Sequence, residues 1–363
     1  MYKGLNDMSL VQRDCGIEVL RCLLMFLITL GHCCFHGPYA TRLSVTVTCT
    51  LTCFCVDAFA FISGYYSIKT TPIRMLKILG QGLYATLIVF LLSREFHFSM
   101  GWYGNAYLVL MIMAPIVNAG IDGIAADRGR RGLYACVSIY IVYMFLMWLP
   151  LEVLSIDIGV SGWYGHSPFL LLGMYLLGRI VAKYHLFHTV KRRYLFVIFV
   201  ALEVFTIGWS ALGRRYQCIS PIKAWDYQSP LMVSLAVVAF LMFRAWKDPT
   251  TSSSRTLISR SSLISKVACI LSPSMFVVYL LHDGAGAVFA RQLFSKLELF
   301  FVDRYSLMHE LPLLSVIVTA IMVYFSCIAV DMCRRLLARL VIELMNKFLH
   351  NTNRTDPCLR IGT

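Results

Sequence analysis

The chain has 363 residues, of which 58% are hydrophobic and 14% are charged, and it carries a net charge of +14 at pH 7. Its mean hydropathy is +0.70, which is far from the balance of a soluble domain. These values exclude an ordinary soluble enzyme and predict a polytopic membrane protein. The first apolar segment follows a polar start of about fifteen residues and precedes many others, so we expect neither a cleavable signal peptide nor a lone anchor.

Ten segments are long and apolar enough to cross a membrane, for which a helix needs about 20 residues. Proline begins or kinks a helix, so the boundaries near Pro168 and Pro273 are the least defined. The longest connections, 247–266 and 291–311, are too short to fold alone. We therefore expect an all-α integral membrane bundle of about ten transmembrane helices, a single domain with no separate soluble domain. The predicted spans are 17–36, 43–66, 73–93, 103–120, 133–151, 166–182, 194–212, 229–246, 267–290 and 312–330.

Most of the 33 Lys and Arg residues fall in segments that are cytoplasmic if the N-terminus is inside. Because positive residues stay on that side, both termini should be cytoplasmic. Topology and contact with lipid headgroups then explain the net charge, and we expect no nucleic acid as a partner. The core is expected at 14–335, and 336–363 should form a cytoplasmic tail that begins as an amphipathic interfacial helix.

The 13 cysteines are interpreted as small apolar side chains. Most of them lie within or beside the predicted spans, and no pair has the two-residue gap that is typical of zinc sites. We therefore expect no metal.

The first span holds four polar side chains that are costly in lipid. A charge near the bilayer centre costs at least ~2.5 to 3.5 kcal/mol, so such residues usually face a protein interior. His32 follows Arg21 by three helical turns plus ~20°, about 16 Å along the axis, so both share a face. Glu18 and His36 extend this face by one turn at each end. We expect a functional site here; the alternatives are a structural Glu18–Arg21 ion pair and histidines that bond between helices.

The second and third spans add further polar groups. Asp57 requires a partner, and His32 is the candidate, since a carboxylate on one imidazole nitrogen leaves the other free as a base. Ser63, Gly64 and Tyr65 permit a close helix approach or a bend. At the start of the third span, two cations one turn apart suit diphosphate oxygens, although the positive-inside bias explains them equally well. They are Arg74 and Lys77.

Two similar strings, "GWYGN" at 101–105 and "GWYGH" at 162–166, begin the fourth and sixth spans. Aromatic residues are common at membrane interfaces, which is one explanation. The other is a pair of platforms for a sugar ring with hydrogen-bonding groups beside them. His282 in the ninth span needs an internal partner, and Glu203 in the seventh should be buried. The residues of the aromatic hypothesis are Trp102, Tyr103, Asn105, Trp163, Tyr164 and His166.

Together these motifs resemble the membrane-bound acyltransferase 3 family. An arginine, ten residues and a histidine in "RCLLMFLITLGH" are followed by an aspartate and "SGYY", and then by "RMLK". The strings "WYGNAYLVLMIMAPIVN", "FLLLGMYLLGRIVAKY" and "SPSMFVVYLLHDGAG" are similar to that family's fourth, sixth and ninth spans. The resemblance covers about residues 14–335. The chain departs from the family in Lys77, where many members have arginine, and in lacking an appended hydrolase-like domain.

The resemblance implies transfer of an acyl group, most often acetyl, from cytoplasmic acetyl-CoA or another acyl-CoA to a hydroxyl of a cell-surface or lipid-linked glycan. It also implies a multi-pass protein of the bacterial cytoplasmic membrane. His32 would be the general base or carry the acyl group itself, with Asp57 or Glu18 orienting the network. Donor binding would fall to Arg21, Arg74, Lys77, Ser63 and Tyr65, and acceptor binding to the aromatic set above with His282.

A transporter is the rival class, in which the same acidic residues and histidines form a proton relay. No inverted repeat is visible beyond the short aromatic one, and the spacing from arginine to histidine favours the enzyme. A non-catalytic scaffold is disfavoured by the number of intramembrane charges.

Overall fold

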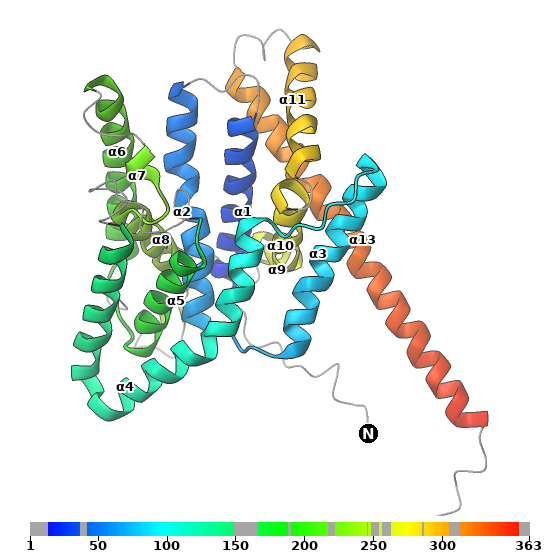
Figure 1. The fold of residues 1–363 in the computed structure, drawn as a ribbon, viewed down its shortest axis with the longest axis horizontal. Coiled ribbons are helices and arrows are strands. Elements are labelled where there is room, and N and C mark those ends of the chain that lie inside the picture. The colour runs from blue at the N-terminus through cyan, green and yellow to red at the C-terminus, as the bar shows by residue number, and fades with distance from the viewer. Residues whose placement is uncertain are drawn as a thin grey trace, which may run out of the picture.

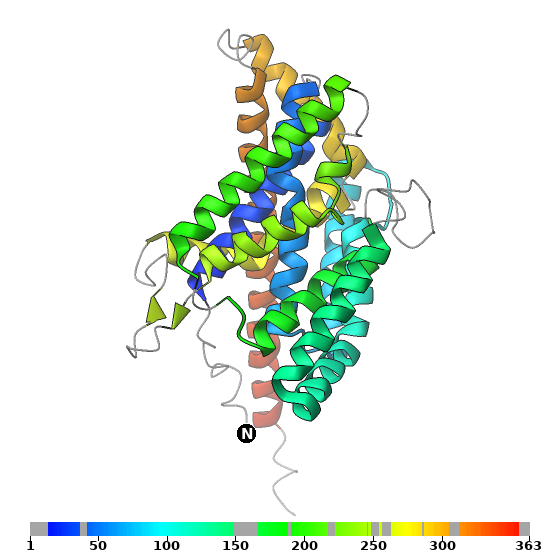
Figure 2. The same ribbon diagram turned by 90° about the vertical axis from the view of Figure 1, so that its left-hand side faces the viewer.

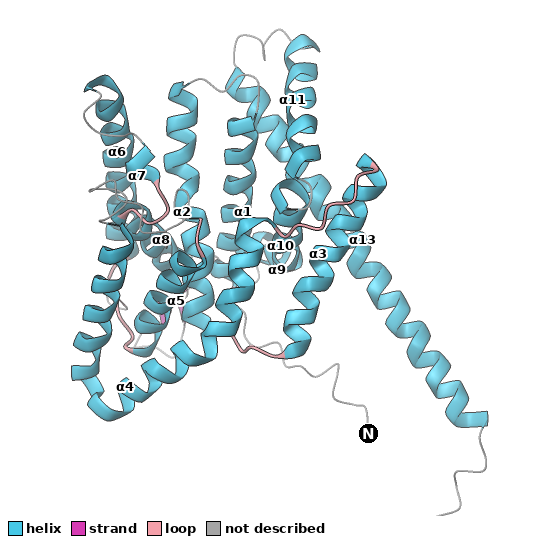
Figure 3. Cartoon of the chain, in the orientation of Figure 1, coloured by secondary structure: helices cyan, strands magenta, loops and turns pink. Residues whose placement is uncertain are grey.

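The protein is an all-α, multi-pass membrane protein. The computed structural model describes residues 14–36, 42–148, 166–187, 190–216, 222–244, 246–247, 254–255, 263–284, 287–304 and 312–355. Almost all of these residues are helical (Figure 3), and seven of the helices are long and apolar enough to cross a membrane.

The helices form a bundle with the two N-terminal helices at its centre (Figure 1). The other helices surround them, together with the segment 263–284, which consists of four short helical elements. In order, the elements are α1 (Cys15–His36), α2 (Arg42–Tyr66), α3 (Pro72–Ser93), α4 (Gly101–Trp148), α5 (Pro168–Lys183), α6 (Arg192–Tyr216), α7 (Ile222–Trp225), α8 (Pro230–Phe243), the two-residue strands β1 (Trp246–Lys247) and β2 (Ser254–Arg255), α9 (Leu263–Leu271), the 3₁₀ turn η3 (Ser272–Ser274), α10 (Met275–Tyr279), the π turn η4 (Leu280–Gly284), α11 (Ala287–Arg304) and α13 (Pro312–Thr355).

Helix α4 contains two of the predicted spans, 103–120 and the described part of 133–151. It bends at Gly129, whose φ of 51° and ψ of −128° are not helical. Glycine adopts such angles because it has no Cβ. The two halves of α4 consequently run in different directions (Figure 1).

The predicted ninth span, 267–290, is not one regular helix. Pro273 cannot donate a backbone hydrogen bond, and the chain changes from α9 to the turn η3 at this point and then to α10 and η4. The prediction that 291–311 is a connection is wrong for the described part, because α11 continues to Arg304. The prediction that Pro273 would interrupt the helix is confirmed.

The last helix extends far beyond the predicted span 312–330. Its 44 residues correspond to about 66 Å at 1.5 Å per residue, more than twice the ~30 Å of hydrocarbon. In Figure 1 the C-terminal part of α13 runs away from the other helices, and in Figure 2 its red end reaches about as low as the bend of α4. The tail is therefore a direct continuation of the last membrane helix.

Three helices begin at a Ser-Pro or Thr-Pro pair. Thr71, Ser167 and Ser229 each accept a hydrogen bond from a backbone N–H of the first turn, and proline follows each of them. This satisfies one of the unpaired amides at a helix start, while proline lacks an amide that would need a partner. These caps fix where α3, α5 and α8 begin.

The centre of the bundle is the crossing of α2 with α5, the most extensive helix contact in the described structure. A Cβ on Gly64 would overlap the backbone of Tyr175, and a Cβ on Gly178 would overlap the carbonyl oxygen of Phe61. The two backbones therefore touch, as small residues allow in membrane helices. The Tyr175 hydroxyl also accepts from the Ile68 amide at 3.1 Å and donates to Asn118 Oδ1 at 2.9 Å.

We expect Gly178→Ala to destabilise the protein by about 1 to 3 kcal/mol, because the added methyl group forces α2 and α5 apart. Thermal unfolding in detergent measures this change. Gly208→Ala is the matched control, since the same atom would meet nothing within 4 Å there. An equal effect of both substitutions on the melting temperature would contradict the close crossing.

Candidate functional site

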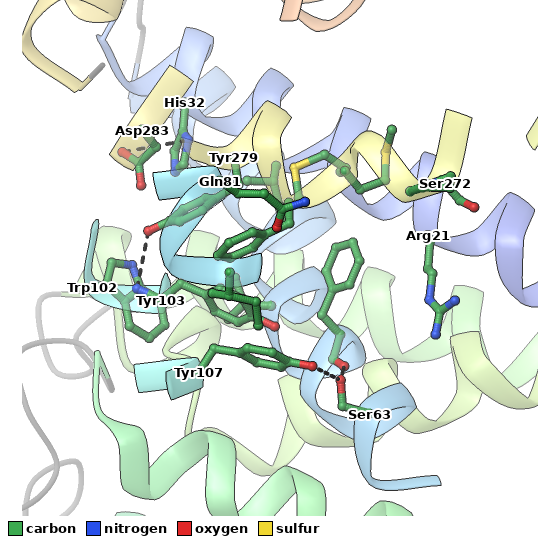
Figure 4. A pocket seen from close by; sticks show the side chains of 18 of the residues that line it. Arg21, His32, Ser63, Gln81, Trp102, Tyr103, Tyr107, Ser272, Tyr279 and Asp283 are labelled. Carbon is green, nitrogen blue, oxygen red and sulfur yellow. Dashed lines mark hydrogen bonds and ion pairs between the residues drawn. The ribbon is translucent and has the colours of Figure 1, made fainter. Parts of the chain in front are cut away.

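A cavity of about 310 Å³ lies among α1, α2, α3, α4 and the segment 263–284 (Figure 4). On α1 it is lined by Arg21, Met25, Ile28 and His32, which are the residues of one helical face. Of the four polar residues predicted on this face, Arg21 and His32 line the cavity, whereas Glu18 and His36 do not. The cavity extends along the helix between a guanidinium at one end and an imidazole at the other.

At the Arg21 end, a carboxylate joins two helices. Arg21 Nη1 donates to Glu18 Oε1 at 2.7 Å, and the Ser272 hydroxyl donates to Glu18 Oε2. Ser272 lies in η3, beside Pro273, and both line the cavity. The Glu18–Arg21 ion pair, which was the structural alternative for these two residues, is present. The charge of Glu18 is shared between a cation and a hydroxyl, which offsets its burial.

The interruption of the segment 263–284 is stabilised from α13. Arg335 Nη1 donates to the carbonyl oxygen of Ile270 at 2.9 Å and to Ser274 Oγ at 3.3 Å. An interrupted helix leaves carbonyl groups without their usual amides, and Arg335 supplies one of the missing donors. This contact holds η3, and with it Ser272, against α1.

At the other end of the cavity, His32 lies beside a carboxylate from η4. His32 Nδ1 is 4.0 Å from Asp283 Oδ1, which suits an ion pair but is too long for a hydrogen bond. His32 and Asp283 both line the cavity, and Figure 4 shows them together at one end. The ring of His36 is 6.3 Å from that of His32.

The expected pairing of His32 with Asp57 is wrong. Asp57 is fully buried and does not line the cavity, and neither of its carboxylate oxygens has a hydrogen-bond partner in the described structure. On α2, Val56, Phe59 and Ser63 face the cavity. At 100° per residue Asp57 lies about 160° from Phe59, on the opposite face of the helix. Asp283 occupies the place that we predicted for Asp57.

The predicted donor residues divide into two groups. Ser63 lines the cavity and shares a 3.4 Å hydrogen bond with the Tyr107 hydroxyl. Tyr65 points elsewhere, because its ring packs on Phe240 at 4.7 Å and lies under the Arg244 guanidinium at 4.9 Å.

Arg74 and Lys77 are exposed and do not line the cavity. Arg74 donates to the carbonyl oxygen of Lys69 at 2.8 Å. The helix α3 lines the cavity with Ile78 and Gln81 instead, which lie within about 40° of Arg74 on the helical wheel. Arg74 therefore precedes the lining residues of α3 by one to two turns, and Lys77 directly precedes the first of them.

His166, the one described residue of the second aromatic string, contacts the first string. The rings of Trp102 and His166 stack at 4.4 Å with 15° between their planes, and the Tyr227 ring is 5.6 Å from Trp102. Tyr103 also lines the cavity, and its amide donates to the Tyr279 hydroxyl at 3.2 Å. Asn105 is exposed and lies outside the lining. Trp163 and Tyr164 lie outside the described residues.

Two further predictions concern buried groups. His282 is 2% exposed, with its ring 5.1 Å from that of His32, so it has the internal neighbour that we expected although it does not line the cavity. Glu203 is buried as predicted. No group of three or more His, Cys, Asp or Glu residues is placed to hold a metal ion in the described part of the chain.

The polar lining residues that the sequence analysis did not single out include Ser272, Tyr227, Tyr279 and Asp283. For Asp283 a signal existed, since an acidic residue in the apolar string "YLLHDGAG" needs a partner as much as Asp57 does. The other three are common residue types that reach the cavity only through the tertiary fold.

Comparison of the chain with protein-family models, curated proteins and solved structures finds no match. The resemblance to the acyltransferase 3 family rests on the sequence motifs alone.

Proposed function

We propose that the chain is a membrane O-acyltransferase that moves an acyl group, acetyl in the simplest case, from acyl-CoA to a hydroxyl of a glycan or lipid-linked saccharide. The observation that supports this most is that one cavity has Arg21 at one end and His32 beside Asp283 at the other. A guanidinium pairs with phosphate oxygens, and an imidazole next to a carboxylate is the usual arrangement of a general base. The length of cavity between them is suited to the extended pantetheine arm of the donor.

In this proposal the donor enters at the Arg21 end. Arg74 and Lys77 on α3 attract its phosphate groups at the entrance, and Arg21 binds them deeper in the cavity. Glu18 holds Arg21 in position before the donor arrives, because its other oxygen is fixed by Ser272. Phosphate oxygens then compete with Glu18 for the guanidinium.

The thioester reaches His32 along an apolar passage. Met25, Ile28 and Phe276 line it, and such walls exclude water that would otherwise hydrolyse the donor. The acceptor hydroxyl attacks the thioester carbonyl while His32 removes its proton, and Asp283 stabilises the imidazolium. The carbon–sulfur bond breaks, and the thiolate of CoA takes the proton. An acyl group held on His32 is the covalent alternative.

The acceptor approaches from the aromatic end. Trp102 and Tyr227 line the cavity together with Asp283, and His166 stacks on Trp102 from outside the lining. Aromatic rings pack on the apolar faces of sugars, and the nearby polar groups bond their hydroxyls. Asn105, which lies outside the lining, is not part of this proposal.

For the topology we propose ten passes with both termini in the cytoplasm of a bacterial cell. The bend of α4 at Gly129 supports two passes from that helix, and α5 and α8 supply shorter ones. The basic residues are then mostly on one side, as the positive-inside rule requires.

A proton-coupled transporter is the second candidate function. Asp57 and Glu203 favour it, since both are buried and their carboxylate oxygens lack hydrogen-bond partners in the described structure. Buried carboxylates of this kind serve as proton carriers in membrane proteins.

To test the topology, epitope tags inserted at 247–266 and at 152–161 are compared for protection from protease in sealed, oriented vesicles. We expect the first tag to be accessible only from the cytoplasmic side and the second only from the outside. Accessibility of both tags from one side would contradict the ten-pass proposal.

To test the chemistry, the full chain in nanodiscs receives acetyl-CoA and a glycolipid extract, and released CoA and acetylated product are measured by mass spectrometry. We expect His32→Ala to lower turnover by about 10² to 10⁴-fold, the usual contribution of positioned proton transfer, with donor affinity nearly unchanged. Arg21→Ala should weaken donor binding as well.

The control for this test is His36→Ala, one turn away on the same helix, with a melting curve for each variant. His36→Ala should lower turnover much less than His32→Ala does. Normal turnover by His32→Ala would refute the catalytic assignment. Absence of acetyl transfer by the wild type, together with proton uptake into vesicles, would instead support the transporter.

A further inference from the structure

A second imidazole lies behind the proposed base. His282 belongs to the π turn η4 and is 2% exposed, and its ring centre is 5.1 Å from that of His32. π turns within helices occur often at functional sites. Asp283, the next residue, lies 4.0 Å from His32 Nδ1.

One hydrogen bond fixes the protonation of this ring. His282 Nδ1 is 2.6 Å from the carbonyl oxygen of Val278. A carbonyl oxygen only accepts, so Nδ1 carries the hydrogen. In a neutral imidazole the other nitrogen then holds a lone pair. His282 Nε2 is thus an acceptor of protons.

This acceptor has no partner in the described structure. His282 Nε2 is buried without a hydrogen bond, and His32 Nδ1 is in the same condition. An unsatisfied buried polar atom costs about 1 to 3 kcal/mol, and such exceptions in a folded protein call for an explanation. Two unsatisfied imidazole nitrogens on adjacent rings are explained together if a proton passes between the rings.

We propose that His282 is the proton store of the acyl-transfer site. This inference rests on the proposed function. The O–H bond of the acceptor breaks as its oxygen bonds to the thioester carbon, and the proton passes to His32 and on to Nε2 of His282. The carbon–sulfur bond then breaks, and the proton returns through His32 to the thiolate of CoA. No proton or electron is gained or lost overall, and Asp283 stabilises the positive charge on either ring.

The ring of His282 also has a structural contact, which the experiment has to separate from proton transfer. In His282→Asn the side-chain amide can still donate to the Val278 carbonyl, but nothing replaces Nε2. In His282→Phe both functions are lost while an aromatic ring is kept. The two variants are compared in full-length protein in nanodiscs with acetyl-CoA and a glycolipid extract.

We expect His282→Asn to keep the melting temperature and the Michaelis constant for acetyl-CoA but to lower kcat by about tenfold or more, as loss of a proton-transfer step does. His282→Phe should lower both kcat and the melting temperature. Near-normal kcat in His282→Asn, with loss only in His282→Phe, would show that the ring is structural and overturn the proposal. The wild-type protein is the control that separates the two proposals. If the wild type transfers no acetyl group, the proposed function fails. If the wild type is active and His282→Asn has near-normal kcat, only the proton store fails.

A second readout does not depend on activity. In protein labelled with ¹⁵N-histidine, the signals absent from His282→Asn identify the ring, and their chemical shifts report which nitrogen is protonated. We expect the hydrogen on Nδ1 and a lone pair on Nε2. A hydrogen on Nε2 in the neutral ring would overturn the proposal.

Discussion

Lipid offers no partner to a polar group, so each charge on α1 must find one inside the bundle. This constraint explains why the segment 263–284 is bound so closely to α1. Its interruption at η3 supplies Ser272 to Glu18 at one end, and its π turn brings Asp283 to His32 at the other. The cavity is the space that remains between these two polar contacts, and its walls are the apolar and aromatic residues between them.

The same constraint makes the interruption of the segment 263–284 unfavourable in free energy unless its backbone groups find other partners. Turns within a membrane helix leave carbonyl groups without amides, and they persist only where the protein supplies other donors. Arg335 of α13 supplies one at Ile270, and the Cys22 thiol of α1 approaches the Ala268 carbonyl at 3.8 Å. The last helix is therefore coupled to the site through the backbone of 263–284, although it does not line the cavity in the described structure.

Helix periodicity predicted correctly which residues of α1 share one face. It placed Arg21 and His32 on one face of α1, and both line the cavity. The same periodicity places Asp57 about 120° from Ser63. Since Ser63 lines the cavity, Asp57 points away from it, and residue type alone did not identify the partner of His32. Pro168 and Pro273 marked a helix start and an interruption correctly, since the effect of proline is local.

Other features depend on tertiary contacts that a single sequence does not contain. Nothing local distinguishes Tyr227 or Ser272 from other residues of their kind, and each reaches the cavity because distant helices pack together. The bend at Gly129 joined two predicted spans in one helix, and α11 lay in a segment too polar to be predicted as a span. The close crossing at Gly64 was indicated by its small side chain, but its partner Gly178 was not.

The central claim is that one continuous cavity carries the donor from Arg21 to His32. Ile28 lies between them and lines the cavity, so Ile28→Trp tests the claim by filling the passage, and Ile198→Trp on an exposed position of α6 is the control. The measurement is acetyl-CoA binding and CoA release by both full-length variants in nanodiscs. The account predicts that Ile28→Trp releases almost no CoA, while Ile198→Trp behaves as the wild type. Unchanged CoA release by a stably folded Ile28→Trp protein would contradict it.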